Sequence, residues 1–309
     1  MPDADYDEFG MLSENADEVG LVLDREPVVT RRSFAVAPGQ EVSAIAWGEA
    51  EPELVLLHGG GQNAHTWDTV VLALGRPVLA IDLPGHGHSD RRTDRDYGPW
   101  RNAEAVASVI DQAAPGAAGV VGMSLGGVTT IRLAATRPDL VRRAVIVDVS
   151  PGVGDPARTM SRADRGAVAL VAGPPVYDSF EAMAEAAVAV SPRRPRSAVE
   201  RGVRHNSVRL PDGRWTWRYD LFGERPAGLT DFTALWEDVS AITAPVMLVR
   251  GGDSKFVTDD DVARFRSRKP GLRTEVVPEA GHAIQSDQPL ALARLIEEFV
   301  FGSRDGAAL

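Results

Sequence analysis

The chain lacks cysteine altogether, so it can form no disulfide bond, no thiolate nucleophile and no zinc–thiolate site. Lysine is almost absent as well, because only Lys255 and Lys269 occur and all the other Lys/Arg positions are arginines. Acidic residues outnumber basic ones by 44 to 33, which gives a formal net charge of −11. Nucleic acid requires a basic face for its phosphates, so this balance argues against a nucleic-acid partner.

Long apolar runs are also missing, since no stretch approaches the roughly 20 residues that cross a membrane. The first 24 residues contain no lysine or arginine, which is unlike a secretory signal or a transit peptide. We therefore expect a cytoplasmic protein without a membrane partner. Residues 1–28 are rich in Asp and Glu, and this composition predicts an acidic, poorly ordered lead-in.

Short β-type runs alternate with helical runs along most of the chain. Strands are expected at Ser33–Ala37, Val42–Trp47, Leu54–Leu57, Val78–Ile81, Ala117–Val121, Arg143–Val149, Pro245–Arg250 and Leu272–Val277. Helices are expected at Trp67–Leu74, Trp100–Ala113, Val128–Ala135 and Leu290–Phe301. This alternation predicts an α/β fold whose mostly parallel, doubly wound sheet is covered by helices on both faces. The core would consist of residues 29–150 and 237–309.

Residues 151–236 break the alternation. Two helical segments, Phe180–Val190 and Arg196–Asn206, are followed by two short strands, Ser207–Leu210 and Arg214–Tyr219, around a Pro-Asp-Gly turn. We expect this region to form an inserted, mainly helical cap over the carboxyl end of the sheet.

The motif Gly122-Met123-Ser124-Leu125-Gly126 stands between an expected strand and an expected helix. Gly-x-Ser-x-Gly in this context is typical of a nucleophile elbow, a tight turn that raises the serine hydroxyl above the sheet edge. The same turn directs the N–H of the following residue, Leu125, toward the place where an oxyanion would form. The motif therefore predicts nucleophilic catalysis by Ser124.

Three further segments accompany the elbow: His58-Gly59-Gly60-Gly61, the Asp82–Ser89 loop and Glu279-Ala280-Gly281-His282. With them, residues 33–150 and 240–301 resemble the α/β-hydrolase family, in its serine-nucleophile, esterase-like branch. The resemblance implies that Ser124 is the nucleophile, His282 the general base, and the backbone N–H groups of Gly60 and Leu125 the oxyanion hole, with Gly61 as the alternative to Gly60. It implies no cofactor and no metal.

The acid of the triad has two candidates. The family commonly places it after the strand Pro245–Arg250, where Asp253 lies one residue early and Ser254 falls on the usual position. Its second place is the end of the strand after the elbow helix, where Asp148 stands 24 residues beyond Ser124. We favour Asp148 and keep Asp253 as the alternative.

The expected reaction is hydrolysis of a small-molecule carboxylic ester or lactone through an acyl-enzyme. Ser124 argues against the branches of the fold that use an aspartate nucleophile. Two alternatives stay open: a carbon–carbon bond hydrolase of ring-cleavage products, although Ala283 replaces the tryptophan common there, and a receptor-like member without turnover. The sequence does not indicate an oligomeric state.

The cap is expected to determine specificity. Trp215, Trp217 and His205 are candidates for the substrate pocket, since the two tryptophans alternate on one strand and share a face. The distal cap is rich in arginine, which would either attract an anionic substrate or form a solvated surface with ion pairs: Arg193, Arg194, Arg196, Arg201, Arg204, Arg209, Arg214 and Arg218.

Overall fold

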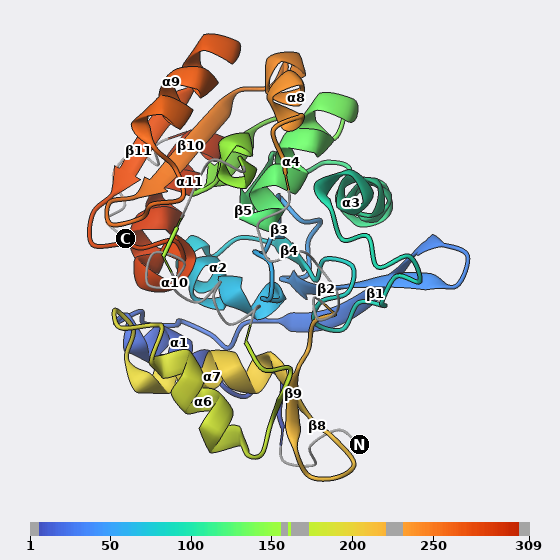
Figure 1. Cartoon of the computed structure of the whole chain (residues 1–309), viewed down its shortest axis with the longest axis vertical. Coiled ribbons are helices and arrows are strands. Elements are labelled where there is room, and N and C mark those ends of the chain that lie inside the picture. Colours follow the sequence, from blue (N-terminus) through green and yellow to red (C-terminus); the bar gives the residue numbers. More distant parts are fainter. Residues whose placement is uncertain (1–5, 156–159, 162–172, 221–230, 303–309) are drawn as a thin grey trace.

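A computed structural model describes residues 6–155, 160–161, 173–220 and 231–302 (Figure 1). Its centre is an eight-stranded sheet in the order β1-β2-β4-β3-β5-β6-β10-β11. The pairs β1·β2 and β2·β4 are antiparallel, and all other neighbouring pairs are parallel. The prediction of a mostly parallel sheet in an α/β fold is confirmed.

The strands correspond to the expected ones within a few residues. They are β1 (Val29–Ala37), β2 (Gln40–Trp47), β3 (Leu54–Leu57), β4 (Val78–Ile81), β5 (Gly119–Met123), β6 (Ala144–Val147), β10 (Val246–Gly251) and β11 (Arg273–Val277). Every residue of β3, β4, β5 and β6 is buried. Continuous apolar runs are typical of parallel strands that are covered on both faces.

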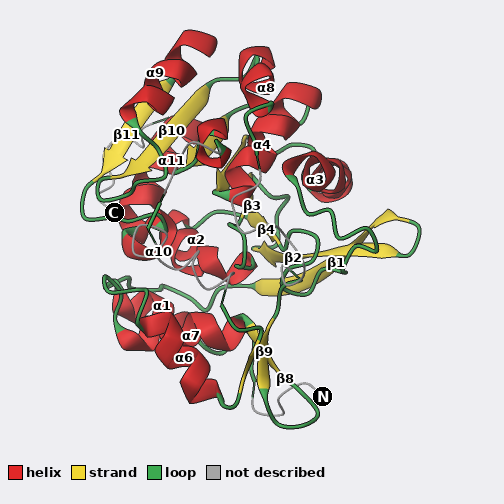
Figure 2. Cartoon of the chain, in the orientation of Figure 1, coloured by secondary structure: helices red, strands yellow, loops and turns green. Residues whose placement is uncertain are grey.

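Helices cover the two faces of the sheet (Figure 2). On one face Val55 and Leu57 of β3 share a core with α3 (Pro99–Ala113), α4 (Leu125–Thr136), α8 (Leu235–Ala241) and α9 (Asp259–Arg268). On the other face Leu54 and Leu56 share a core with α2 (Asp68–Leu74), α10 (Ile284–Asp287) and α11 (Pro289–Phe301). The 3₁₀ turn η1 (Ala64–Trp67) precedes α2. No helix among the described residues is both long and apolar enough to cross a membrane.

Helices α8 and α9 were not expected from the sequence. Helix α9 begins with three consecutive aspartates and has few apolar residues, so its pattern is that of a polar surface segment. The sequence feature that could have predicted this helix lies at its N-terminus. There the Thr258 side chain accepts a hydrogen bond from the Asp261 N–H, and the Asp261 side chain accepts one from the Thr258 N–H, which makes a capping box.

Residues 176–217 form a separate layer (Figure 1). It contains α6 (Phe180–Val188), α7 (Arg196–His205) and a three-stranded antiparallel sheet of β7 (Val176–Tyr177), β9 (Trp215–Trp217) and β8 (Ser207–Arg209). It has a small apolar core of its own around Met183, Val203 and Trp217. The 3₁₀ turn η2 (Pro151–Gly154), which follows β6, packs instead with the main core through Val153. The expected helices and hairpin are present. The bounds of the cap, residues 151–236, stay a prediction. Within them, residues 156–159, 162–172 and 221–230 lie outside the described residues.

The acidic lead-in differs from the expected poorly ordered segment. Residues 11–19 contain helix α1 (Leu12–Glu18), in which Leu12 and Ala16 are buried and Leu12 shares an apolar core with α2. Two of its acidic side chains are paired, because Arg201 of the cap donates to Glu14 and Glu18. Apolar contacts and partner arginines, neither visible in the composition of the segment itself, order this part of the chain.

A polar cluster joins the lead-in, the core and the cap. The His65 ring lies between two carboxylates, with Nδ1 2.8 Å from Asp68 Oδ2 and Nε2 3.1 Å from Glu8 Oε1. It stacks on the ring of His205 at 3.8 Å, and His205 Nδ1 lies 2.7 Å from the Tyr6 hydroxyl. Burial would lower the pKa of His65, but the two carboxylates outweigh it and raise the pKa to about 9. The protonated ring donates to both carboxylates.

This pKa predicts a pH-dependent stability. Because folding raises the pKa of His65 above its ordinary value of about 6.5, the contribution of its charge is complete below that pH and is lost as the pH rises through about 9. The difference in Tm between the wild type and His65→Gln should therefore shrink between about pH 6.5 and pH 10 in thermal denaturation followed by circular dichroism.

His88→Gln is the matched control. Burial, together with Arg31 and Arg218, lowers the pKa of His88 to about 4, so its ring is neutral throughout this range. The Tm difference of that variant should stay constant. A constant difference for His65→Gln as well would mean that the His65 ring is neutral in the folded protein.

Candidate active site

Ser124 lies at the turn between β5 and α4. Its backbone has φ 51° and ψ −114°, in a region that a serine rarely adopts and that costs conformational energy. The turn is held by the Ser124 N–H, which donates to the Val147 carbonyl at 3.1 Å, and by the Gly126 N–H, which donates to the His58 carbonyl at 3.0 Å. The strand–serine–helix turn expected from the motif is present.

The two glycines of the motif are required by close contacts. A Cβ atom on Gly122 would lie 2.2 Å from the Gly126 carbonyl oxygen, and one on Gly126 would lie 2.2 Å from the Leu57 carbonyl oxygen. Neither backbone can move without separating α4 from the sheet. The spacing of Gly-x-Ser-x-Gly therefore follows from how closely the helix approaches β3 and β5.

Asp148 directly follows β6 and is fully buried. Its Oδ2 lies 2.8 Å from His282 Nδ1. The same carboxylate accepts the Gly251 N–H at 2.9 Å and the hydroxyl of Ser254. Three donors thus compensate for the removal of this charge from water.

His282 follows β11 and is also buried. Its ring stacks on Phe256 at 3.4 Å with an angle of 12° between the planes. Because Nδ1 faces a carboxylate, which only accepts, the proton lies on Nδ1 and Nε2 is the basic nitrogen. Nε2 is buried and has no hydrogen-bond partner among the described residues. It is therefore available to a group inside the cavity.

Asp253, the alternative acid, is placed differently. Its side chain is 52% exposed and forms an ion pair with Arg193 of the cap at 3.0 Å. The neighbouring Ser254 occupies the position expected for the usual acid and donates to Asp148. The structure thus brings Asp148, and not Asp253, against the His282 ring.

The glycine-rich loop after β3 is fixed by His58. Its Nδ1–H donates to the Gly59 carbonyl at 2.8 Å, and its Nε2 accepts the Leu83 N–H at 2.9 Å. Burial lowers the pKa of His58, in agreement with a neutral ring. The loop brings Gly60 and Gly61 to the wall of the cavity that also contains Ser124.

The N–H of Leu125 is the first of helix α4, so it has no acceptor within the helix. Gly60, the other donor expected from the sequence, lines the cavity that contains Ser124. Gly61, the alternative, has φ 76°, and its carbonyl accepts a hydrogen bond from Asn206 of the cap at 2.6 Å.

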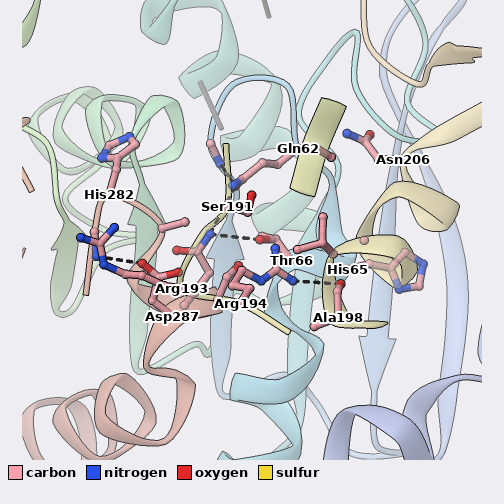
Figure 3. A pocket seen from close by; sticks show the side chains of 18 of the residues that line it. Gln62, His65, Thr66, Ser191, Arg193, Arg194, Ala198, Asn206, His282 and Asp287 are labelled. Atoms are coloured by element: carbon pink, nitrogen blue, oxygen red, sulfur yellow. Dashed lines mark hydrogen bonds between the residues drawn. The ribbon is translucent and has the colours of Figure 1, made fainter. Parts of the chain in front are cut away.

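The cavity has a volume of about 550 Å³ and lies between core and cap (Figure 3). His205 and Trp217 line it, as expected. Trp215 does not, and this expectation is corrected: its ring lies 5.3 Å from that of Phe180, in the packing of the cap. Two residues along a strand span roughly 6–7 Å, which carries Trp215 away from the cavity although it shares a face with Trp217.

Of the described residues, His65, Asp68 and His205 are the group whose ligand atoms lie close enough for a metal ion, within 4.8 Å of one another. In this structure both nitrogens of His65 face carboxylates and the two rings are stacked. Lone pairs in two parallel, stacked ring planes do not converge on one ion.

Sequence reasoning missed three contributors to the site. Ser254 and Phe256 support Asp148 and His282, and Asn206 holds the glycine-rich loop. For Ser254 a sequence signal was available, because a serine stands at the position where the family commonly has its acid. No sequence signal connects Asn206 with Gly61, because 145 positions separate them.

Comparison with known proteins identifies the family of the chain. The model of the alpha/beta hydrolase family matches residues 54–295. Esterase Rv0045c of Mycobacterium tuberculosis is 49% identical over 291 residues, 94% of each chain. A solved structure of the M. tuberculosis esterase Rv0045c superposes with a TM-score of 0.83 at 47% identity, covering 96% of this chain and 99% of that one. Lipase LipV of the same organism is 30% identical over 261 residues, 81% of this chain and 94% of LipV. The chain therefore belongs to the α/β-hydrolase family.

Proposed function

We propose that this protein hydrolyses small carboxylic esters or lactones through an acyl-enzyme on Ser124, with His282 as general base and Asp148 as the acid of the triad. The observation that carries the proposal is the position of the His282 ring. Its Nδ1 is bound to a buried carboxylate, and its unpartnered Nε2 belongs to a residue that lines the same cavity as Ser124.

The first step requires a base, because a serine hydroxyl is a weak nucleophile at neutral pH. His282 Nε2 accepts the Ser124 proton while the oxygen attacks the carbonyl carbon. The ring then carries a positive charge, which the Asp148 carboxylate stabilises through Nδ1–H. The Gly251 N–H and the Ser254 hydroxyl donate to this carboxylate and hold it in orientation.

Attack places a negative charge on the carbonyl oxygen. The backbone N–H groups of Leu125 and Gly60 are the proposed donors to this oxyanion, with Gly61 as the alternative. Both belong to segments fixed by hydrogen bonds, α4 and the loop bound to His58, so little reorganisation is required during the reaction.

Collapse of the intermediate expels the alcohol, which takes the proton from His282. Water then enters, gives a proton to Nε2 and attacks the acyl-enzyme. As the bond from the acyl carbon to Ser124 Oγ breaks, His282 returns the proton to Oγ and the acid product leaves. The similarity to proteins named esterase and lipase supports an ester as the substrate.

Ser124→Ala tests the nucleophile. Hydrolysis of p-nitrophenyl butyrate should fall by about a thousandfold or more in kcat, because no acyl-enzyme can form. The Tm should stay close to that of the wild type, since the Ser124 hydroxyl forms no hydrogen bond with another described residue. Activity that survives in a pure preparation of this variant would contradict the proposal.

Asp148→Asn and Asp253→Asn separate the two candidate acids. The first replaces the acceptor of His282 Nδ1–H by an amide, so kcat should fall by roughly three to four orders of magnitude. The second removes only an exposed partner of Arg193 and should change kcat less than about threefold. The comparison is made by steady-state kinetics on variants of matched thermal stability; the reverse pattern would assign the acid to Asp253.

A further inference from the structure

Arg194 lies between α6 and α7, and its side chain lines the cavity that contains Ser124 and His282 (Figure 3). One of its N–H groups, on Nη2, donates to the Ala198 carbonyl at 3.1 Å. Its Nε is buried and has no partner among the described residues. A guanidinium carries five N–H donors, and leaving them unpaired away from water is costly. The site thus contains a cation with unused donors.

Several other arginines of the cap have acidic partners. Arg193 forms an ion pair with Asp253, Arg201 with Glu14 and Glu18, and Arg196 with two glutamates. No ion pair joins Arg194 to a carboxylate of the described residues. The idea that the cap arginines form a surface balanced by ion pairs therefore fits these neighbours but not Arg194.

The two carboxylates whose charges act on Arg194, Asp287 and Glu18, already have other partners. Asp287 accepts the Gly281 N–H at 2.8 Å, and Glu18 receives Arg201. Both act on Arg194 through space without contacting it, and burial lowers the pKa of its guanidinium. A ligand that brought a negative charge into the cavity would satisfy donors that the protein leaves open.

We propose that the substrate is an ester carrying a free carboxylate, and that Arg194 binds this carboxylate while Ser124 attacks the ester carbonyl. The inference rests on the proposed function and names its substrate class. A carboxylate matches the planar donor pair of a guanidinium and forms charge-assisted hydrogen bonds with it. A cavity of about 550 Å³ has room for both ends of such a molecule.

The negative net charge of the protein bears on how it could bind an anionic ester. With a net charge of −11 the protein repels anions in general, so an anionic substrate needs a local cation. A neutral acyl chain that filled the cavity would displace water from Arg194 and offer it no acceptor. Arg194 therefore strengthens the binding of anionic esters and weakens the binding of neutral ones.

The test compares p-nitrophenyl hydrogen glutarate with p-nitrophenyl valerate, whose five-carbon acyl chains differ only at the far end. In Arg194→Gln, kcat/KM for the glutarate ester should fall by about 10- to 100-fold, and that for the valerate ester should stay the same or rise. Arg193→Gln is the matched control, because Arg193 is already paired, and should leave the ratio of the two esters unchanged. Equal effects of Arg194→Gln on both esters would overturn the proposal.

A second pair of esters locates the carboxylate. In 3-(butyryloxy)propanoate the acid lies on the alcohol side, and its hydrolysis is followed by pH-stat against propyl butyrate. If Arg194→Gln lowers kcat/KM only for the glutarate ester, the Arg194 site lies on the acyl side. If it lowers kcat/KM only for the propanoate, the site lies on the alcohol side. Loss with neither rejects the site.

Binding of free glutaramate, whose one carboxylate and one amide mimic the two ends of the glutarate ester, supplies a measurement independent of turnover. Calorimetry should show glutaramate binding to the wild type at least about tenfold more tightly than the neutral pentanamide, and Arg194→Gln should abolish the difference. Equal affinities in the wild type would overturn the site even if the variant fails to fold. Hydrolysis of the valerate ester by the wild type would still support the proposed esterase, so the two proposals fail separately.

Discussion

The contact between the buried Asp148 carboxylate and the His282 ring is the constraint on which the rest of the site depends. Asp148 directly follows β6, its Oδ1 partner Gly251 ends β10, and His282 follows β11, so one carboxylate joins the carboxyl ends of three adjacent parallel strands. A fully buried charge is tolerated only with such partners. The contact also fixes the ring tautomer, and with it the nitrogen that faces the cavity.

The lead-in and the cap complete this core by pairing charges. Glu8 of the lead-in binds Arg31 of β1 and His65, while Arg201 of α7 binds Glu14 and Glu18. The acidic start of the chain thus neutralises positive groups of the core and of the cap. Arg194 has no acidic partner among the described residues, and a cation in a cavity with an unused donor is the property expected of a ligand-binding group rather than of a stabilising one.

Much of the core and of the site could be predicted from the sequence, because the determinants are local. Apolar runs specify the strands, and the spacing of glycines around Ser124 reflects contacts within one turn. Long-range pairing is what the sequence does not contain. The sequence around Trp215 does not indicate that its ring packs against Phe180. The sequence of the lead-in does not indicate that its glutamates pair with Arg201. The choice between Asp148 and Asp253 likewise depends on the sheet order, which places β6 beside β10.

The central claim is that Ser124 is a nucleophile activated by His282, and covalent labelling tests it most directly. Wild-type protein treated with a small organophosphate should gain the mass of one phosphoryl adduct in intact-protein mass spectrometry. Peptide mapping should place the adduct on Ser124, and the unlabelled protein should turn over a short p-nitrophenyl ester. Labelling without turnover would indicate a receptor-like member of the family, and failure to label Ser124 would contradict the account.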